Sequence, residues 1–288
     1  MPLVGITSRV TTAFTVGDRT LTPEALTEGV TLSRRLAPRV AVNASELVFV
    51  GYGISAPEFG WDDYKGVDVR GKTVVMLIND PPVTDATGRL DPAVFGGNAM
   101  TYYGRWTYKY EIASAKGAAA CLIVHETGPA GYPFAVVAAN GGRENFDLRT
   151  PDANASRVAV EGWLALDFTR ALFTAAGEDF AKLKAAAATR EFKPVPLKAR
   201  ASFTVANQIR DVVSRNVVAL LPGADPVRRA EFVIFTAHWD AFGRNPALAG
   251  DQILNGAADN AIAVAMLLEL SRAAVALPVA ARPAPSLL

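Results

Sequence analysis

The residues of this sequence with the clearest chemical potential are a histidine and two aspartates near the end of the chain, His238, Asp240 and Asp259. An imidazole nitrogen can bind a divalent metal ion, and a carboxylate two residues later can orient the ring. A carboxylate at the start of a helix can then bridge two ions. Histidine followed two residues later by aspartate also occurs for purely structural reasons, so the pair indicates a metal site only together with its surroundings.

The segments that would position these side chains can be predicted from hydropathy. Residues 232–237 form a continuous apolar run, which predicts a strand buried on both faces of a parallel sheet. His238 follows at the carboxyl end of that strand, where open α/β sheets place their ligand sites. After a loop rich in Gly, Pro and Asn, a helix is predicted over residues 260–273, with Asp259 or Asn260 as its N-cap. The helix is apolar nearly all round, which predicts that it is buried.

Three stretches carry a family resemblance: HWDAFG at 238–243, GDQILNGAADNA at 250–261 and LLEL at 267–270. Together they resemble the di-zinc aminopeptidase and glutamate-carboxypeptidase-like family of metallopeptidases. The resemblance implies a zinc-dependent exopeptidase that releases a terminal residue from a peptide substrate, with two zinc ions that polarise the scissile carbonyl and hold a hydroxide.

The resemblance also assigns roles to individual residues. His238 corresponds to the first zinc ligand, Asp240 to the catalytic carboxylate that orients the site, and Asp259 to the bridging ligand. In the family, the bridging residue is often joined to the next residue by a cis peptide bond. The residues that would bind substrate, the residue preferred and the end of the peptide attacked stay undetermined.

The sequence departs from the family pattern after Glu269. The family continues with a Glu-Glu pair, which supplies the general base and a ligand, and with a further Asp and a second His. Residues 270–288 contain no Asp, Glu or His. We therefore expect an N- and C-terminally incomplete family member that binds zinc weakly or not at all and is catalytically inactive. The alternative is a non-catalytic binding or interaction protein.

A second resemblance covers the middle of the chain. The stretches ELVFVGYGI (46–54), DYKGVDVRGKTVVML (63–77) and ASAKGAAACLIV (113–124) resemble the protease-associated domain, which is inserted in some members of the same peptidase family. We therefore predict an α/β protein in which a partial mixed-sheet zinc-exopeptidase domain carries an inserted, β-rich α/β protease-associated domain. The expected boundaries are 1–44 and a truncated 198–288 for the peptidase domain and 45–197 for the insertion. The alternative function named above would use this inserted domain.

Patterning predicts the remaining elements. Strands are predicted at 3–7, 47–54, 74–78, 118–124, 199–206 and 215–221, and helices at 21–35, 108–116, 166–177 and 178–190. The segments 217–221 and 232–237 are expected to form a hairpin-like or edge pairing that delivers His238.

Composition limits the partners. The chain of 288 residues has 29 basic and 28 acidic residues, so its charge favours neither a nucleic acid nor an anionic membrane. No apolar run approaches the roughly 18 residues needed to span a bilayer, and the first residues do not resemble a secretory signal. The resemblance nevertheless implies a secreted or periplasmic location for an intact family member. The oligomeric state is not indicated.

Four further features were weighed as candidate sites. The single cysteine, Cys121, lies in an apolar run and is expected to be a buried thiol. His125 is expected to be a surface or hydrogen-bonded residue rather than a ligand, and Asp62 and Asp63 to be solvated carboxylates. The segment 131–148 is either an ordinary surface loop or, by analogy, a segment that touches the peptidase substrate.

Overall fold

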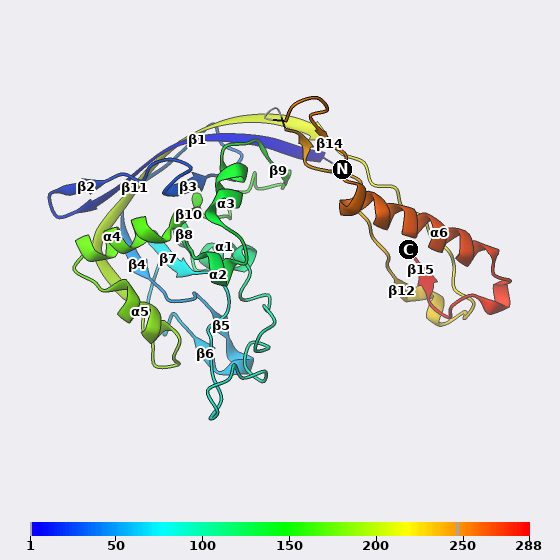
Figure 1. The fold of residues 1–288 in the computed structure, drawn as a ribbon, viewed down its shortest axis with the longest axis horizontal. Helices are drawn as coiled ribbons and strands as arrows, with labels where there is room; N and C mark the ends of the chain where they lie inside the picture. Colours follow the sequence, from blue (N-terminus) through cyan, green and yellow to red (C-terminus); the bar gives the residue numbers. More distant parts are fainter. Residues whose placement is uncertain (1, 246–247) are drawn as a thin grey trace. The chain divides into compact units, whose positions relative to one another are not determined.

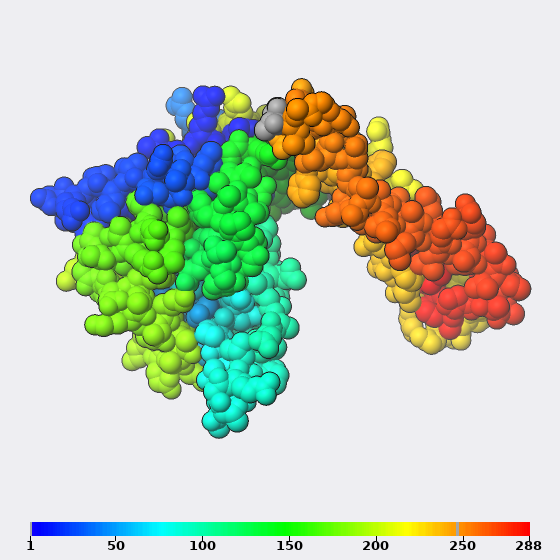
Figure 2. Space-filling view, viewed as in Figure 1, coloured from blue at the N-terminus to red at the C-terminus, as the bar shows by residue number. Residues whose placement is uncertain are grey.

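The computed structural model describes residues 2–245 and 248–288, which form two compact units. Unit 1 is Met1–Ser214, and unit 2 is Arg215–Leu288. Figures 1 and 2 show unit 1 in blue to yellow-green and unit 2 in yellow to red. Each unit is described by itself.

Unit 1 is built on a nine-stranded mixed sheet. Its strands are β1 (Pro2–Val16), β2 (Arg19–Leu21), β3 (Gly29–Leu32), β4 (Arg39–Phe49), β7 (Thr73–Leu77), β8 (Ala120–His125), β9 (Asn145–Leu148), β10 (Val160–Ala165) and β11 (Val195–Val213). The order is β2-β1-β11-β4-β7-β8-β10-β3, and β9 pairs with β1. Neighbours from β4 to β10 are parallel, and the other pairs are antiparallel. The predicted α/β class with a mixed sheet is therefore confirmed.

The parallel strands follow directly from the sequence. Every residue of β7 and β8 is buried, as a strand covered on both faces requires. Both strands lie where the apolar runs 74–78 and 118–124 predicted them. Two further strands, β5 (Ser55–Ala56) and β6 (Trp61–Asp62), form a short separate hairpin.

The two long strands β1 and β11 differ from the prediction. They pair in antiparallel register from Pro2↔Val213 to Thr15↔Arg200 (Figure 1). Alternate residues of β11 are buried, so this strand contributes one face to the core of the sheet. The boundary between the two compact units falls between residues 214 and 215 of the chain. The sequence analysis placed domain boundaries at 44/45 and 197/198. The assignment of these ranges to a peptidase and a protease-associated domain stays a prediction.

Helices cover both faces of the sheet. They are α1 (Trp106–Ala115), α2 (Thr127–Ala130), α3 (Phe134–Gly141), α4 (Leu166–Ala175) and α5 (Phe180–Ala187), with a 3₁₀ turn η1 at Pro57–Phe59. The helices predicted at 108–116, 166–177 and 178–190 are confirmed as α1, α4 and α5. The helix predicted at 21–35 is wrong, because residues 29–32 instead pair with β10 as the edge strand β3 and bury Val30.

The core of unit 1 lies on the two faces of the sheet. On one face α4 and α5 pack against the sheet, and Phe49 makes edge-on ring contacts with Phe173, Phe180 and Phe192. On the other face, residues of α1, α2 and α3 pack against Val74, Met76 and neighbouring strand residues. Unit 1 therefore has an apolar core on each side of the sheet.

Unit 2 contains little regular structure. Its elements are η2 (Arg228–Ala230), β12 (Phe232–Val233), β13 (Gly243–Arg244), β14 (Ile253–Leu254), the π-helical turn η3 (Ala257–Ala261), α6 (Ile262–Ala276), η4 (Val279–Ala281) and β15 (Ser286–Leu287). β12 pairs with β15 in parallel, and β13 pairs with β14 in antiparallel orientation.

Several predictions for unit 2 are wrong. Residues 215–221 form no strand, and the predicted strand 232–237 is reduced to β12, whose two residues are exposed. The predicted hairpin is absent because β12 pairs with β15 instead. The helix predicted at 260–273 is present as α6, but it is not buried. Among the described residues of unit 2 only Ala274 and Ser286 are buried, because too few elements surround the apolar segments to cover them.

None of the helices in the described part of the chain is long and apolar enough to cross a membrane.

Candidate metal centre

The three predicted site residues lie in irregular backbone of unit 2. His238 follows β12 by five residues, rather than ending a long strand as the sequence predicted. Asp240 lies in the same loop, and Asp259 lies in the turn η3, immediately before α6. Residues 246 and 247 of the predicted intervening loop are outside the described residues.

The side chains of these residues converge on the His238 ring. Nε2 of His238 lies 3.0 Å from Oδ1 of Asp259. On the other side of the ring, Nδ1 lies 3.1 Å from the backbone carbonyl oxygen of Asp240 and 3.3 Å from its Oδ1. One imidazole therefore faces the two aspartates through its two different nitrogens.

The backbone at Asp259 matches one expectation and contradicts another. The peptide bond between Asp259 and Asn260 is cis, as the family resemblance implied. Neither Asp259 nor Asn260 caps the helix that follows, because both lie inside the turn η3, before the N-cap position of α6. The N-cap of α6 is Ala261, without a side-chain hydrogen bond.

The electrostatics of this group follow from its exposure and its neighbours. All three side chains are more than half exposed. The hydrogen bond to the Asp240 carbonyl oxygen, together with the nearby carboxylates of Asp240 and Asp259, raises the pKa of His238. In the neutral ring, a proton on Nδ1 that is held by Asp240 leaves Nε2 as the free lone pair. Nε2 is the nitrogen that faces Asp259.

The donor set can be tested against the requirements of zinc. Zinc takes imidazole nitrogen and carboxylate oxygen as ligands, so Nε2 of His238 and Oδ1 of Asp259 are suitable in kind. In number they fall short, because zinc prefers about four ligands. Residues 2–245 and 248–288 contain no group of three or more His, Cys, Asp or Glu side chains placed to hold a metal ion. These residues therefore fit a zinc ion in kind but not in number.

The other histidine of the chain and its single cysteine both belong to unit 1. Cys121 is fully buried, which confirms the predicted buried thiol, and burial raises its pKa. His125 was expected at the surface or hydrogen-bonded. It is not at the surface, whereas a hydrogen bond with the backbone of Tyr132 contributes to its electrostatics. Its ring is buried between Tyr132, Phe134 and Trp163, and Nε2 has no hydrogen-bond partner in the structure. Burial lowers the pKa of His125 and favours the neutral ring.

The expectation of two solvated carboxylates fails for Asp63. Its side chain is buried and accepts hydrogen bonds from the backbone nitrogen of Ile54 and from Nε1 of Trp61. Burial raises the pKa of Asp63 to about 6. These contacts hold the β5–β6 hairpin and indicate a structural role.

Sequence reasoning missed a buried lysine, Lys109 on α1. Its Nζ donates to the carbonyl oxygens of Tyr52 and Asn79 at 2.7 and 3.1 Å. Burial lowers the pKa of Lys109 to about 7. The signal in the sequence was a lysine between two aromatic residues, Tyr108 and Tyr110, inside a predicted helix.

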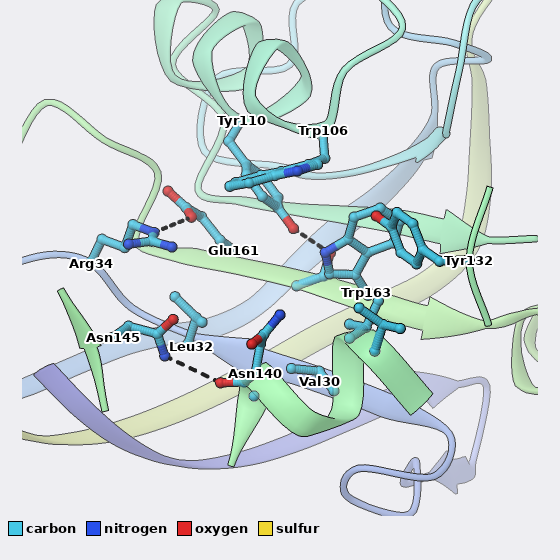
Figure 3. A pocket seen from close by; sticks show the side chains of 14 residues that line it. Val30, Leu32, Arg34, Trp106, Tyr110, Tyr132, Asn140, Asn145, Glu161 and Trp163 are labelled. Carbon is cyan, nitrogen blue, oxygen red and sulfur yellow. Dashed lines mark hydrogen bonds and ion pairs between the residues drawn. The ribbon is translucent and has the colours of Figure 1, made fainter. Parts of the chain in front are cut away.

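The segment 131–148 is not simply an exposed loop. It contains α3 and β9, and several of its residues line a hollow in unit 1 (Figure 3). Sequence reasoning also missed the charged residues of this hollow, Arg34 and Glu161. The one available signal was Glu161 itself, a charged residue inside the apolar run 158–164.

Comparison with known families bears on unit 2. Residues 216–283 match the model of Peptidase family M28. No curated protein matches the chain. The matched residues include His238, Asp240 and Asp259 and lie entirely within unit 2. The match supports a metallopeptidase of a family whose members are generally zinc-dependent.

Proposed function

We propose that unit 2 carries part of the metal site of an aminopeptidase-like zinc exopeptidase that acts on a peptide substrate. His238 and Asp259 are the metal ligands in this proposal, and Asp240 orients the His238 ring. The observation that carries it is the 3.0 Å approach of Nε2 to Oδ1 of Asp259, inside the segment that matches Peptidase family M28. Both atoms are of the kinds that zinc accepts.

We further propose that the 288-residue chain by itself does not hydrolyse peptides. Two ligands bind zinc much more weakly than a complete set, and catalytic groups that act together lose nearly all activity when several are missing. The other histidine, His125, is buried in unit 1. Glu269 lies on α6, where its carboxylate pairs with Arg272, so neither residue is a convincing substitute.

The protease-associated resemblance is proposed for unit 1. What supports it is the succession of β4, β7, α1 and β8 across the three stretches that carry the resemblance. The long strands β1 and β11 share the same sheet. A domain of this kind in unit 1 therefore includes residues that the sequence alone assigned to the peptidase domain.

Zinc binding can be followed directly at the ligand. The chain has only two histidines, so the ring-proton NMR signals of His238 and His125 can be assigned by substitution. We expect zinc to shift or broaden the His238 signal in a saturable way and to leave His125 as an internal reference. Asp259→Ala should weaken or abolish this response. Asp251→Ala is the matched control, because it removes another carboxylate of unit 2, one that accepts a hydrogen bond from the backbone nitrogen of Ile253.

The outcomes separate the two candidate functions. Saturable zinc binding that depends on Asp259, without hydrolysis of aminoacyl-anilides or peptides, supports a partial peptidase site. A His238 signal that does not respond to zinc, in an inactive chain, favours the alternative of a non-catalytic binding protein. Zinc-dependent turnover that is lost in Asp259→Ala would overturn the proposed inactivity.

A further inference from the structure

A hollow of about 290 Å³ lies in unit 1 between α1, α3 and the edge of the sheet. Figure 3 shows Trp106 and Tyr110 of α1 on one side, and Tyr132 and Trp163 together on another. Arg34 and Glu161 lie across from Tyr132 and Trp163 (Figure 3). The volume of the hollow is at the lower end of the range of ligand pockets, roughly 300–1,000 Å³. The hollow therefore suits a group about as large as an amino-acid side chain.

Four aromatic side chains of the hollow, those of Trp106, Tyr110, Tyr132 and Trp163, offer ring faces and few charges. The rings of Trp106 and Tyr110 pack against each other at 6.1 Å. The rings of Tyr132 and Trp163 instead pack on His125 behind them. Because that imidazole is buried and favours its neutral form, the aromatic wall carries no positive charge. Aromatic faces attract cations through the negative side of their quadrupole.

The charged side of the hollow contains a buried carboxylate, Glu161, that forms an ion pair with Arg34. Glu161 is buried, and its Oε2 accepts a hydrogen bond from Nε of Arg34 at 3.1 Å. Arg34 also approaches Asp147 at 3.5 Å. Asp147 has a second and closer partner in Arg157, at 2.7 Å. Glu161 therefore shares the guanidinium of Arg34 with another carboxylate.

A wider hollow adjoins the first and shares Arg34, Trp106, Tyr110 and Glu161 with it. Its lining adds two carboxylates and one guanidinium. The charged residues lining the two hollows are the acids Glu111, Asp147 and Glu161 and the bases Arg34 and Arg157. The lining thus has one more carboxylate than it has guanidinium groups. The shared wall also makes the smaller hollow a side pocket of a longer groove.

We propose that the aromatic hollow of unit 1 binds an organic cation, an alkylammonium or guanidinium group, between the ring faces and Glu161. An anion would have to approach Arg34 beside the carboxylates of Glu161 and Asp147, which repel it. A cation would contact the aromatic faces and Glu161, whose negative charge is only partly neutralised by Arg34. The group can belong to a free small molecule or to a basic side chain of a peptide that lies along the adjoining groove. This inference does not depend on whether unit 2 binds zinc.

The charge requirement is tested with matched probes on the full chain. Nα-acetyl-arginine amide and Nα-acetyl-citrulline amide have almost the same shape, but only the first is charged. Binding is measured by calorimetry and by intrinsic tryptophan fluorescence, to which Trp106 and Trp163 contribute with the two other tryptophans of the chain. We expect saturable binding of the arginine probe and at least roughly ten-fold weaker binding of the citrulline probe. Equal binding of the two, preference for Nα-acetyl-glutamate amide, or no binding of any cationic probe would overturn the proposal.

The site is tested with Trp106→Leu. Trp106 is 41% exposed, so its replacement removes a ring face with little effect on the core. We expect the affinity for the arginine probe to fall by roughly 2- to 30-fold, the range of a cation–π contact. Trp239→Leu is the matched control, because Trp239 is an exposed tryptophan of unit 2 and should leave the affinity unchanged. Equal loss in both variants would contradict the assignment of the site.

Glu161→Gln tests the carboxylate and should reduce the preference for arginine over citrulline. Circular dichroism establishes whether this buried variant folds, and Trp106→Leu carries the test if it does not. The two sources of the cation are distinguished by comparing the free probe with acetylated peptides of several residues that contain one central arginine. Tighter binding of the peptide identifies a polypeptide ligand that uses the groove. Equal binding identifies a small-molecule ligand.

Discussion

The Asp240 backbone carbonyl oxygen lies closer to Nδ1 of His238 than any side-chain oxygen of Asp240 does, at 3.1 Å against 3.3 Å. The main chain therefore contributes to fixing the ring and its proton, with the carboxylate as a second contact. The opposite nitrogen, Nε2, faces Asp259. The orientation that a metal ligand needs is thus partly independent of the residue type at position 240.

This arrangement predicts a graded effect of Asp240→Asn on the proposed zinc site. Loss of an orienting carboxylate typically lowers metal affinity by roughly 10- to 100-fold. Because the backbone oxygen remains in Asp240→Asn, we expect a loss near the lower end, about ten-fold. The measurement is a zinc titration followed at the His238 ring protons, with Asp251→Asn as control. A complete loss of binding, equal to that of His238→Ala, would show that the side chain alone holds the ring.

Lys109 should make the stability of unit 1 depend on pH. Its folded pKa is about 7, below the ordinary 10.5, because the ammonium is buried. Between these values the unfolded chain binds a proton that the folded chain does not, so the contribution of Lys109 to stability rises with pH and is lost as pH falls toward 7.

Urea unfolding at pH 7.5 and pH 9 tests this sign. We expect the free energy of unfolding of the unsubstituted chain to increase relative to that of Lys109→Met as the pH is raised. Cys121, whose pKa is raised by burial and lowered by the charge of Lys109, is present in both proteins, so the difference between them reports Lys109 together with its effect on Cys121. An identical pH dependence in the two proteins would mean that Lys109 keeps its ordinary pKa.

The sequence predicted the buried parallel strands well and the long antiparallel pair poorly. Runs such as 118–124 are recognisable because a strand covered on both faces must be apolar throughout. The pairing of β1 with β11 joins residues about 200 positions apart and leaves no local signal beyond alternation. The domain boundaries predicted from local sequence features therefore placed β1 and most of β11 in a different domain from β7 and β8, although all four strands belong to one sheet.

The candidate site shows the same difference between local and long-range information. His238, Asp240 and Asp259 were selected through a family resemblance carried by short stretches, and the structure brings them together. Their catalytic and metal-binding roles stay predictions. The aromatic hollow joins Arg34 to Glu161, which lie far apart in the chain and share no motif. Only the three-dimensional fold identifies such a group.

The burial of Phe49 predicts that its replacement costs much more stability than replacement of an exposed phenylalanine of unit 2. Its ring is fully buried against three other phenylalanines, so Phe49→Ala should destabilise unit 1 by about 3–5 kcal/mol. Phe242→Ala is the matched control. This ring is 75% exposed, so its loss should change the free energy of unfolding by no more than about 0.5 kcal/mol. Comparable losses in urea unfolding would contradict the burial of one ring and the exposure of the other.

Limited proteolysis should reveal the unit boundary. Residues 214–227 are outside any strand or helix, and Val217 and Val218 are strongly exposed, so trypsin should cut early at Arg215. The persistent fragment should retain the N-terminal strand, because β1 is hydrogen-bonded to β11 along nearly its whole length.

The fragment is identified by mass spectrometry of a time course. We expect a species that begins near the N-terminus and ends at Arg215, together with rapid loss of unit 2, whose described residues bury little. In Arg215→Gln the first cut should move to Arg228 or Arg229, while the N-terminal end of the fragment stays the same. A resistant core close to 45–197, with β1 removed early, would instead support the boundaries predicted from the sequence. That result would show that β1 and β11 are not an integral part of the sheet in solution.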